Sequence, residues 1–295
     1  MSKQPLSFSI VDVFAEHKYE GNQLAVFRHA AHLSTEEMLA ITREMNFSET
    51  TFILSEEPVN GGYDVRIFTP KEEVEFAGHP TLGTAYIIQK DIVGHPVQQI
   101  VLNLKIGQIP VTFDEKNPGM AWMQQKPPIF GEIIDLDTIA AVLGIPASSI
   151  DPRYPIQEVS TGLPALIVPL KSLKDVQRCK VNRDLYFQLI EPLSAKMILV
   201  FCPETCQAGN TLNARVFGDY YGAPEDPATG SANGDLAGYL VKYRYFGNES
   251  IDISVEQGFE IMRPSILYHR ASQKEDHISI QIGGKTIYTA KGEWV

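Results

Sequence analysis

Apolar and polar residues are arranged along the first half of the chain in patterns that predict both strands and helices. Ser34 followed by Glu37 matches a capping box that starts a helix, and Met38, Ile41 and Met45 then fall on one helix face. Short runs that are rich in β-branched or aromatic residues, or that alternate apolar with polar residues, predict strands. These runs cover residues 50–54, 63–68, 100–104, 109–113 and 121–123. The last three predict an antiparallel meander.

The second half repeats this order of elements. The sequence Lys126-Pro127-Pro128 interrupts the meander, and a helix that ends at Gly144 follows it. Strand-like runs then precede another helix and further antiparallel strands. These runs cover residues 165–168, 197–201 and 214–217. We therefore expect two domains, residues 1–125 and 126–295, and the division leaves open whether the last strand packs on the first domain.

Two stretches, one in each half, share a strand, a loop and a glycine-containing turn that opens a helix. The first turn is Gly78-His79-Pro80-Thr81, and the second is Thr229-Gly230-Ser231. The first backbone N–H groups of a helix have no partner within the helix, and glycine lets a ligand approach them. The turns therefore predict two sites for an anion or oxyanion. The alternative is two ordinary capped helices whose ends bind nothing.

The helices that follow these turns have almost no polar face. A helix that is apolar on most sides is buried, and Gly83, Gly234 and Gly238 permit close approach of neighbouring elements. We therefore expect an α+β fold of two pseudo-symmetric domains, each a curved antiparallel sheet wrapped around its central helix. Both helix N-termini are then expected at the domain interface, where small-molecule sites concentrate.

The composition narrows the class of protein. The chain has 295 residues, of which 44% are hydrophobic, so it is long enough for two domains with large cores. Its formal net charge of -11 argues against binding to nucleic acid or to anionic membranes. We expect no secretory segment, because residues 1–5 lead directly into a strand-like run, and no membrane-spanning run. Three cysteines are a sparse, odd set that suits a reducing compartment, so we expect a cytoplasmic protein.

Glu49 is the first candidate for chemistry. It lies where a helix gives way to an apolar strand, so its carboxylate can be partly desolvated and its pKa raised, as a general acid or base near neutral pH requires. The alternative is a glutamate that starts a strand and faces water. His79 and Asp226 are expected at matching positions just before or within the two turns, where both can hydrogen-bond a substrate. Their alternatives are a structural histidine and a turn or capping aspartate.

Two other chemistries are disfavoured. The seven histidines form no HxH or HExxH cluster, so we expect no metal site. Ser231 follows Gly230 but lacks the Gly-x-Ser-x-Gly elbow of many serine hydrolases.

Four motifs occur along nearly the whole chain in a characteristic order. They are Val11-Asp12-Val13-Phe14 with Gly21-Asn22, then Ser48-Glu49-Thr50, then Gly78-His79-Pro80-Thr81, and finally Asp226-Pro227-Ala228-Thr229-Gly230-Ser231-Ala232. With these motifs the chain resembles the PhzF-like family of the phenazine-biosynthesis type. The resemblance implies the diaminopimelate epimerase-like fold and a homodimer. Gln23 stands where relatives commonly carry proline, a departure that we expect to be harmless.

The resemblance also implies roles for particular residues, with Glu49 matching the proton shuttle of the family. Other matching residues bind or orient the substrate, or hold its carboxylate or enolate through backbone groups. They are His79, Asp226 and Ser231 through their side chains, and Gly78 and Gly230 through their backbone. Related racemases and epimerases use two cysteines at positions that align with Ala77 and Ala228. Alanine cannot transfer a proton, so a two-thiol epimerase is disfavoured.

The leading hypothesis is a cofactor-independent isomerase that acts on a small unsaturated or cyclic carboxylic acid. Glu49 would remove a proton from a carbon next to a carboxylate or carbonyl and return it at a conjugated position, while the helix N-termini stabilise the developing charge. The second hypothesis is a metabolite-binding or protein-interaction module with the same fold and little catalysis, because a fold does not fix a function. A lyase or hydrolase that uses the same Glu49 is the third.

Overall fold

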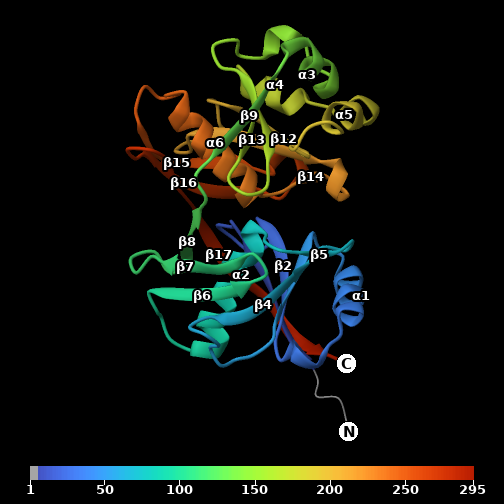
Figure 1. Cartoon of the computed structure of the whole chain (residues 1–295), viewed down its shortest axis with the longest axis vertical. Helices are drawn as coiled ribbons and strands as arrows, with labels where there is room; N and C mark the ends of the chain where they lie inside the picture. Colours follow the sequence, from blue (N-terminus) through green and yellow to red (C-terminus); the bar gives the residue numbers. More distant parts are fainter. Residues whose placement is uncertain (1–5) are drawn as a thin grey trace. The chain divides into compact units, whose positions relative to one another are not determined.

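The computed structural model describes residues 6–295, so the expectation for residues 1–5 lies outside the described part of the chain (Figure 1). The chain forms two compact units. The first combines Met1–Gln124 with Gly283–Val295, and the second is Gln125–Ile282. The division into domains at residue 125 stays a prediction.

The first unit is built mainly of strands, with two α-helices and a π-helical segment that continues the second helix. In chain order its elements are β1 (Leu6–Val13), β2 (Asn22–Phe27), η1 (Ala30–His32), α1 (Thr35–Met45), β3 (Glu49–Ile53), β4 (Tyr63–Phe68), β5 (Glu73–Val74), α2 (Gly78–Ile87), η2 (Ile88–Val93), β6 (Gln99–Leu104), β7 (Gly107–Phe113), β8 (Met120–Gln125) and the end of β17 (Ile278–Trp294). β1 pairs antiparallel with both β2 and β17, and β6, β7 and β8 form the expected meander.

The second unit has more helix. Its elements are β9 (Ile129–Ile134), α3 (Leu136–Leu143), η3 (Ala147–Ser149), β10 (Ile156–Ser160), β11 (Ala165–Pro169), α4 (Leu173–Arg178), α5 (Arg183–Ile190), β12 (Met197–Cys202), β13 (Leu212–Gly218), η4 (Asp219–Tyr221), β14 (Ala223–Asp226), α6 (Gly230–Lys242), β15 (Ser250–Gln257), η5 (Phe259–Ile261), β16 (Ser265–Gln273) and the start of β17. Apolar faces of α3, α4 and α5 pack with β11 and β12 in one core cluster.

The order of strand pairing is the same in the two units. β1–β2 is antiparallel, β2–β3 parallel, β3–β4 antiparallel and β4–β6 parallel. In the second unit, β10–β11, β11–β12, β12–β13 and β13–β15 follow the same sequence of directions. The repeat that the two turn motifs indicated therefore extends to the backbone pairing.

The expectation of an antiparallel sheet in each domain is only partly correct, because both units also contain parallel strand pairs. Parallel neighbours need a crossover connection, which a helix usually supplies. Here α1 lies between β2 and β3, and α2 lies between β4 and β6. In the second unit α4 and α5 lie between β11 and β12, and α6 lies between β13 and β15.

Local signals in the sequence are confirmed at several helix ends. At the start of α1, the Glu37 N–H donates to Ser34 Oγ (3.1 Å), and the Ser34 N–H donates to Glu37 Oε2 (2.9 Å). This is the expected capping box. Gly144 ends α3 in the left-handed conformation, with φ of 63°, as expected for a glycine that stops a helix.

The helices α2 and α6 are the most buried helices of their units, as predicted. Every residue of α2 except Tyr86 is buried, and every residue of α6 except Lys242. Gly83 lets α2 approach β1 and β2, since a Cβ atom at that position would lie 2.7 Å from Leu24 Cδ2 and 2.8 Å from Val13 Cγ2. In α6, Gly238 lies against Pro128 and Ile280 in the same way.

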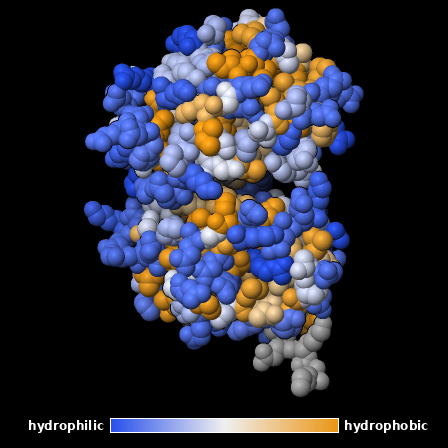
Figure 2. Space-filling view, viewed as in Figure 1, coloured by the Kyte–Doolittle hydropathy of each residue, from blue (hydrophilic) through white to orange (hydrophobic). Residues whose placement is uncertain are grey.

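The visible surface is dominated by hydrophilic residues, and apolar side chains occur on it in scattered groups (Figure 2). Within residues 6–295, none of the helices combines the length and the apolar composition that a membrane crossing needs.

Candidate active site

Glu49 and His79 come together in the first unit. Glu49 is the first residue of β3, where it pairs in parallel register with Leu24 of β2, and His79 is the second residue of α2. His79 Nε2 lies 3.5 Å from Glu49 Oε2, and the two side chains are 5% and 20% exposed. The Glu49 carboxylate is therefore mostly withdrawn from water.

His79 is neutral near pH 7. Burial lowers its pKa to about 3, against the opposing effect of a hydrogen bond with the backbone of Gln23. Since Nε2 faces Glu49, the nitrogen that meets Gln23 is Nδ1, and a bond that favours the protonated ring is one in which the imidazole donates to a carbonyl. Nε2 is then left as an acceptor directed at Glu49.

The contact between Glu49 and His79 bears on where a proton can lie. An acceptor nitrogen and an ionised carboxylate repel each other at 3.5 Å unless a proton lies between them. A proton shared between the two atoms would remove this repulsion.

Gln23 is a site residue that the sequence did not reveal. Its contribution is a backbone contact to His79, and its side chain is exposed. A backbone contact depends only weakly on the identity of the residue, so other side chains at position 23 are compatible with it. Ser48, directly before Glu49, donates its hydroxyl to Asn22 Oδ1 (3.2 Å), so the starts of β2 and β3 are tied beside the Glu49–His79 pair.

The N-terminus of α2 has no side-chain cap. Its N-cap residue, Ala77, is extended and has no side-chain oxygen, and Thr81 Oγ1 instead donates back to the Ala77 carbonyl (2.7 Å). The first N–H groups of the helix, including those of Gly78 and His79, are therefore available to an anion.

The N-terminus of α6 repeats this arrangement in the second unit. Its N-cap residue, Thr229, likewise makes no side-chain capping bond, and Gly230 and Ser231 are the first two helical residues. Thr229 Oγ1 instead donates to Asp226 Oδ2 (2.5 Å), and Gln257 bridges the turn from β15 by donating to the Asp226 carbonyl (2.8 Å) and accepting from the Thr229 N–H (3.2 Å).

The structure assigns different positions to His79 and Asp226. Ser231, and not Asp226, is the counterpart of His79, since both are the second residue of a buried helix. Asp226 ends β14, and its bond with Thr229 fits the alternative in which it shapes the turn.

In each unit, an arginine of the strand before the turn forms a bidentate contact with a glutamate of the segment that leads to the turn. Arg66 donates Nε and Nη2 to Glu73 (2.9 and 2.8 Å), and Arg215 does the same with Glu225 (2.9 and 2.6 Å). These arginines occupy matching places in β4 and β13 and lie over Phe68 and Phe217. The same kind of arginine–glutamate contact therefore positions both loops.

Neither turn contains a cysteine, and burial raises the pKa of the Cys179 and Cys202 thiols to about 12. Among residues 6–295, no group of three or more His, Cys, Asp or Glu side chains has an arrangement that would hold a metal ion.

The strand-dominated mixed fold places the protein among racemase- and epimerase-type folds. A structure described as a probable proline racemase from Agrobacterium radiobacter matches it with a TM-score of 0.64, covering 98% of this chain and 93% of that chain. The sequences are 10% identical, so this likeness concerns the fold alone. The chain belongs to the PhzC-PhzF family, described as phenazine biosynthesis-like protein, which it matches over residues 11–292.

Relatives within this family agree over almost the full length of the chain. The chain is 33% identical to trans-2,3-dihydro-3-hydroxyanthranilate isomerase of Pseudomonas chlororaphis, covering 97% of this chain and 98% of that protein. The crystal structure of a PhzF-family phenazine biosynthesis protein from Bacillus anthracis matches with a TM-score of 0.91 and 27% identity, covering 99% of each chain. The protein is therefore an isomerase with a small-molecule substrate.

Proposed function

We propose that the protein moves a proton within a small unsaturated or cyclic carboxylic acid, without a cofactor, and that Glu49 is its general acid/base. The observation that carries this proposal is the contact between Glu49 Oε2 and the Nε2 atom of a buried, neutral His79 at 3.5 Å. A carboxyl group in such surroundings can both accept and return a proton near neutral pH.

The reaction would proceed in two steps. Glu49 takes a proton from a carbon next to the substrate carboxylate or carbonyl, and the electron pair of the C–H bond moves into the conjugated system. The N–H groups at the start of α2 stabilise the resulting negative charge on oxygen. Glu49 then returns the proton at the far end of the conjugated system, so the mass of the substrate does not change.

His79 would keep the proton of Glu49 in place during this cycle. Its Nε2 accepts from protonated Glu49, while Nδ1 remains bound to the Gln23 backbone. This contact would hold the transferred proton on Glu49 until the proton returns to the substrate.

We assign substrate binding to both helix starts. Gly78 and Gly230 would offer backbone N–H groups to a carboxylate or enolate, and His79 and Ser231 would offer side chains from equivalent positions. Asp226 would orient the substrate together with the α6 turn that it holds through Thr229. The Pseudomonas chlororaphis relative is named for a dihydro-hydroxyanthranilate, a cyclic carboxylate, which supports this class of substrate.

We also infer that each unit is a sheet curved around its buried helix, in two pseudo-symmetric domains of the diaminopimelate epimerase type. The support is the shared order of strand directions and the burial of α2 and α6. We also propose that the protein is a cytoplasmic homodimer. Light scattering after size exclusion measures the subunit number, and a monomer would contradict it.

The test is solvent exchange. Wild-type protein in D₂O is incubated with a panel of small unsaturated and cyclic carboxylic acids that includes trans-2,3-dihydro-3-hydroxyanthranilate, and each acid is analysed by mass spectrometry and NMR. We expect isomerisation with deuterium incorporation, and loss of both in Glu49→Gln. The matched control is Glu44→Gln, which removes an exposed carboxylate from α1 of the same unit.

Three outcomes would contradict the proposal. Full activity in Glu49→Gln would remove the assigned base. Binding of an acid without exchange would favour the metabolite-binding module. A product of different mass would favour a lyase or hydrolase.

A further inference from the structure

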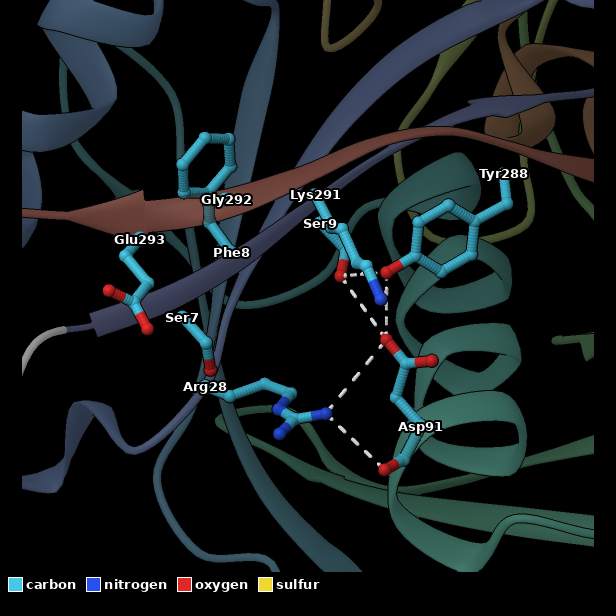
Figure 3. Close-up of a pocket in the computed structure, with 9 residues that line it drawn as sticks. All are labelled: Ser7, Phe8, Ser9, Arg28, Asp91, Tyr288, Lys291, Gly292 and Glu293. Atoms are coloured by element: carbon cyan, nitrogen blue, oxygen red, sulfur yellow. Dashed lines mark hydrogen bonds and ion pairs between the residues drawn. The ribbon is translucent and has the colours of Figure 1, made fainter.

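The first unit contains a pocket of about 450 Å³ that none of the proposed catalytic residues lines (Figure 3). Its walls come from β1, from Arg28 directly after β2, from Asp91 in η2 and from the C-terminal end of β17. Small-molecule sites commonly measure about 300–1,000 Å³. The pocket is thus large enough for a metabolite and separate from Glu49 and His79.

Two serines of β1 create this hollow. Strand register sets Ser7 opposite Glu293 and Ser9 opposite Lys291, and alternation along the strands directs all four side chains to one face. On the other side of β1, the Ser7 carbonyl accepts the N–H of Arg28 (2.9 Å). Short side chains in the middle strand therefore lie between long charged ones, which leaves open space above the sheet.

One wall of the pocket is already fixed by internal contacts. Asp91 Oδ2 accepts from the Tyr288 hydroxyl (2.8 Å) and from Ser9 Oγ (3.3 Å). Arg28 Nη1 donates to the Asp91 carbonyl (3.3 Å) and lies 3.8 Å from its carboxylate, while Arg28 Nε lies 3.0 Å from Glu56 Oε1. The charges of Asp91 and Arg28 are therefore largely compensated before any ligand arrives.

The remaining polar groups of the pocket are uncommitted. Ser7 Oγ is buried and has no hydrogen-bond partner among residues 6–295. The side chains of Lys291 and Glu293 are exposed, and within the same described range neither forms an ion pair. A buried hydroxyl without a partner is unfavourable, so a ligand that hydrogen-bonds to Ser7 gains by supplying one.

The charges decide the class of ligand. Two cations, Arg28 and Lys291, and two carboxylates, Asp91 and Glu293, line the pocket. A simple anion or cation would meet repulsion as well as attraction, because the uncommitted groups have opposite signs. A ligand that carries both signs on neighbouring atoms can satisfy Lys291 and Glu293 at once. Typical small-molecule sites are lined mostly by apolar side chains, whereas this pocket is lined largely by polar and charged ones, which also favours a polar ligand.

We propose that this pocket binds a small zwitterionic metabolite of the free α-amino-acid class. The ligand carboxylate lies against the Lys291 ammonium and the Ser7 hydroxyl, and the ligand ammonium lies against the Glu293 carboxylate.

The test is isothermal titration calorimetry of the wild-type protein with each of the common free L-α-amino acids. The tightest ligand is then compared with its N-acetyl and its carboxamide derivatives, which each lack one of the two charges. We expect one site per chain, and about ten-fold weaker binding, or more, for both derivatives and for Glu293→Gln and Lys291→Gln, since each change removes a charge-assisted contact. Ser7→Val should also weaken binding, by filling the hollow and removing the hydroxyl.

Matched controls separate this site from others. Glu275→Gln removes an exposed carboxylate in the second unit and should leave the affinity unchanged. Glu49→Gln should also leave it unchanged, because Glu49 does not line the pocket. The proposal is overturned if no amino acid binds, if both blocked derivatives bind as well as the parent, or if the ligand binds equally to Glu293→Gln and Lys291→Gln. None of these results bears on proton transfer by Glu49.

Discussion

The two arginine–glutamate pairs near the turns can be compared within one molecule, because their contacts are the same but their burial differs. The Arg215 and Glu225 side chains are 9% and 11% exposed, whereas those of Arg66 and Glu73 are 25% and 21% exposed. Arg215 also donates through Nη1 to three carbonyls that end α4, namely those of Val176 (2.9 Å), Gln177 (3.4 Å) and Cys179 (3.2 Å). Arg66 instead makes one further bond, to Thr35 Oγ1 (2.9 Å).

The free energy of unfolding should therefore fall by different amounts when each guanidinium group is removed. Arg215→Met leaves a buried carboxylate and several carbonyls without their donor, and breaking a buried pair in this way costs about 3–5 kcal/mol. Arg66→Met breaks a more exposed pair, which typically costs about 1 kcal/mol. Arg215→Lys should recover little, since an ammonium cannot form the bidentate contact. The double variant Arg215→Met with Glu225→Met should be more stable than Arg215→Met alone, because it also removes the unpaired carboxylate.

The assay exploits the distribution of tryptophan. Both tryptophans, Trp122 and Trp294, belong to the first unit, so their fluorescence during urea unfolding reports that unit. Far-UV circular dichroism and hydrogen exchange of peptides from α4 and α6 report the second unit. Arg215→Met should shift the second-unit signals toward lower urea and accelerate exchange around α4. A cost for Arg66→Met that equals or exceeds the cost for Arg215→Met would refute the argument from burial.

Three further predictions concern packing, titration and the backbone contact to His79. Gly83→Ala should destabilise the first unit by about 1–3 kcal/mol in urea unfolding, because the new methyl group would lie 2.7 Å from Leu24 Cδ2. Burial lowers the pKa of His269 to about 3, below its ordinary 6.5, so the unfolded chain binds the proton first as pH falls. The stability difference between wild type and His269→Gln should therefore shrink by about 1.4 kcal/mol per pH unit from pH 6.5 toward 3, measured by urea unfolding at several pH values; a constant difference would contradict this. Gln23→Ala should retain deuterium exchange, since Gln23 contacts His79 only through its backbone, whereas a large loss would assign a role to the side chain.

Signals that act over a few residues could be read from the sequence. The capping box at Ser34, the helix stop at Gly144 and the buried character of α2 and α6 depend on local chemistry or on helical periodicity, and all are confirmed. The repeated turn motifs were recognisable because residue types recur in them at similar spacing.

Features that depend on which strands pair could not be predicted from local sequence patterns. Periodicity identifies a strand but not its neighbour, so the parallel pairings β2–β3 and β4–β6 were missed. The contact of His79 with Gln23 uses a backbone group, which leaves no mark on residue type. The pocket at Ser7 depends on pairing between β1 and β17, which lie at opposite ends of the chain.

The shared pairing order also shows where the two units have diverged. Glu49 begins β3 opposite Leu24, and the equivalent position, which begins β12 opposite Ala165, is Met197. At the second position of the buried helix, His79 in the first unit corresponds to Ser231 in the second. The duplicated backbone therefore carries a carboxylate–imidazole pair in one unit and a thioether and a hydroxyl in the other.

This asymmetry favours one base over two. A two-base racemase needs a proton-transferring group from each half, and methionine and alanine at positions 197 and 228 supply none. Asp226 is the acidic group nearest in sequence to the second turn, and it is held in the turn by the Thr229 hydroxyl at 2.5 Å. The proposed transfer, in which Glu49 alone removes a proton and returns it elsewhere on the same substrate, is compatible with these residues, whereas inversion at one carbon by two opposed groups lacks a second base at positions 197 and 228.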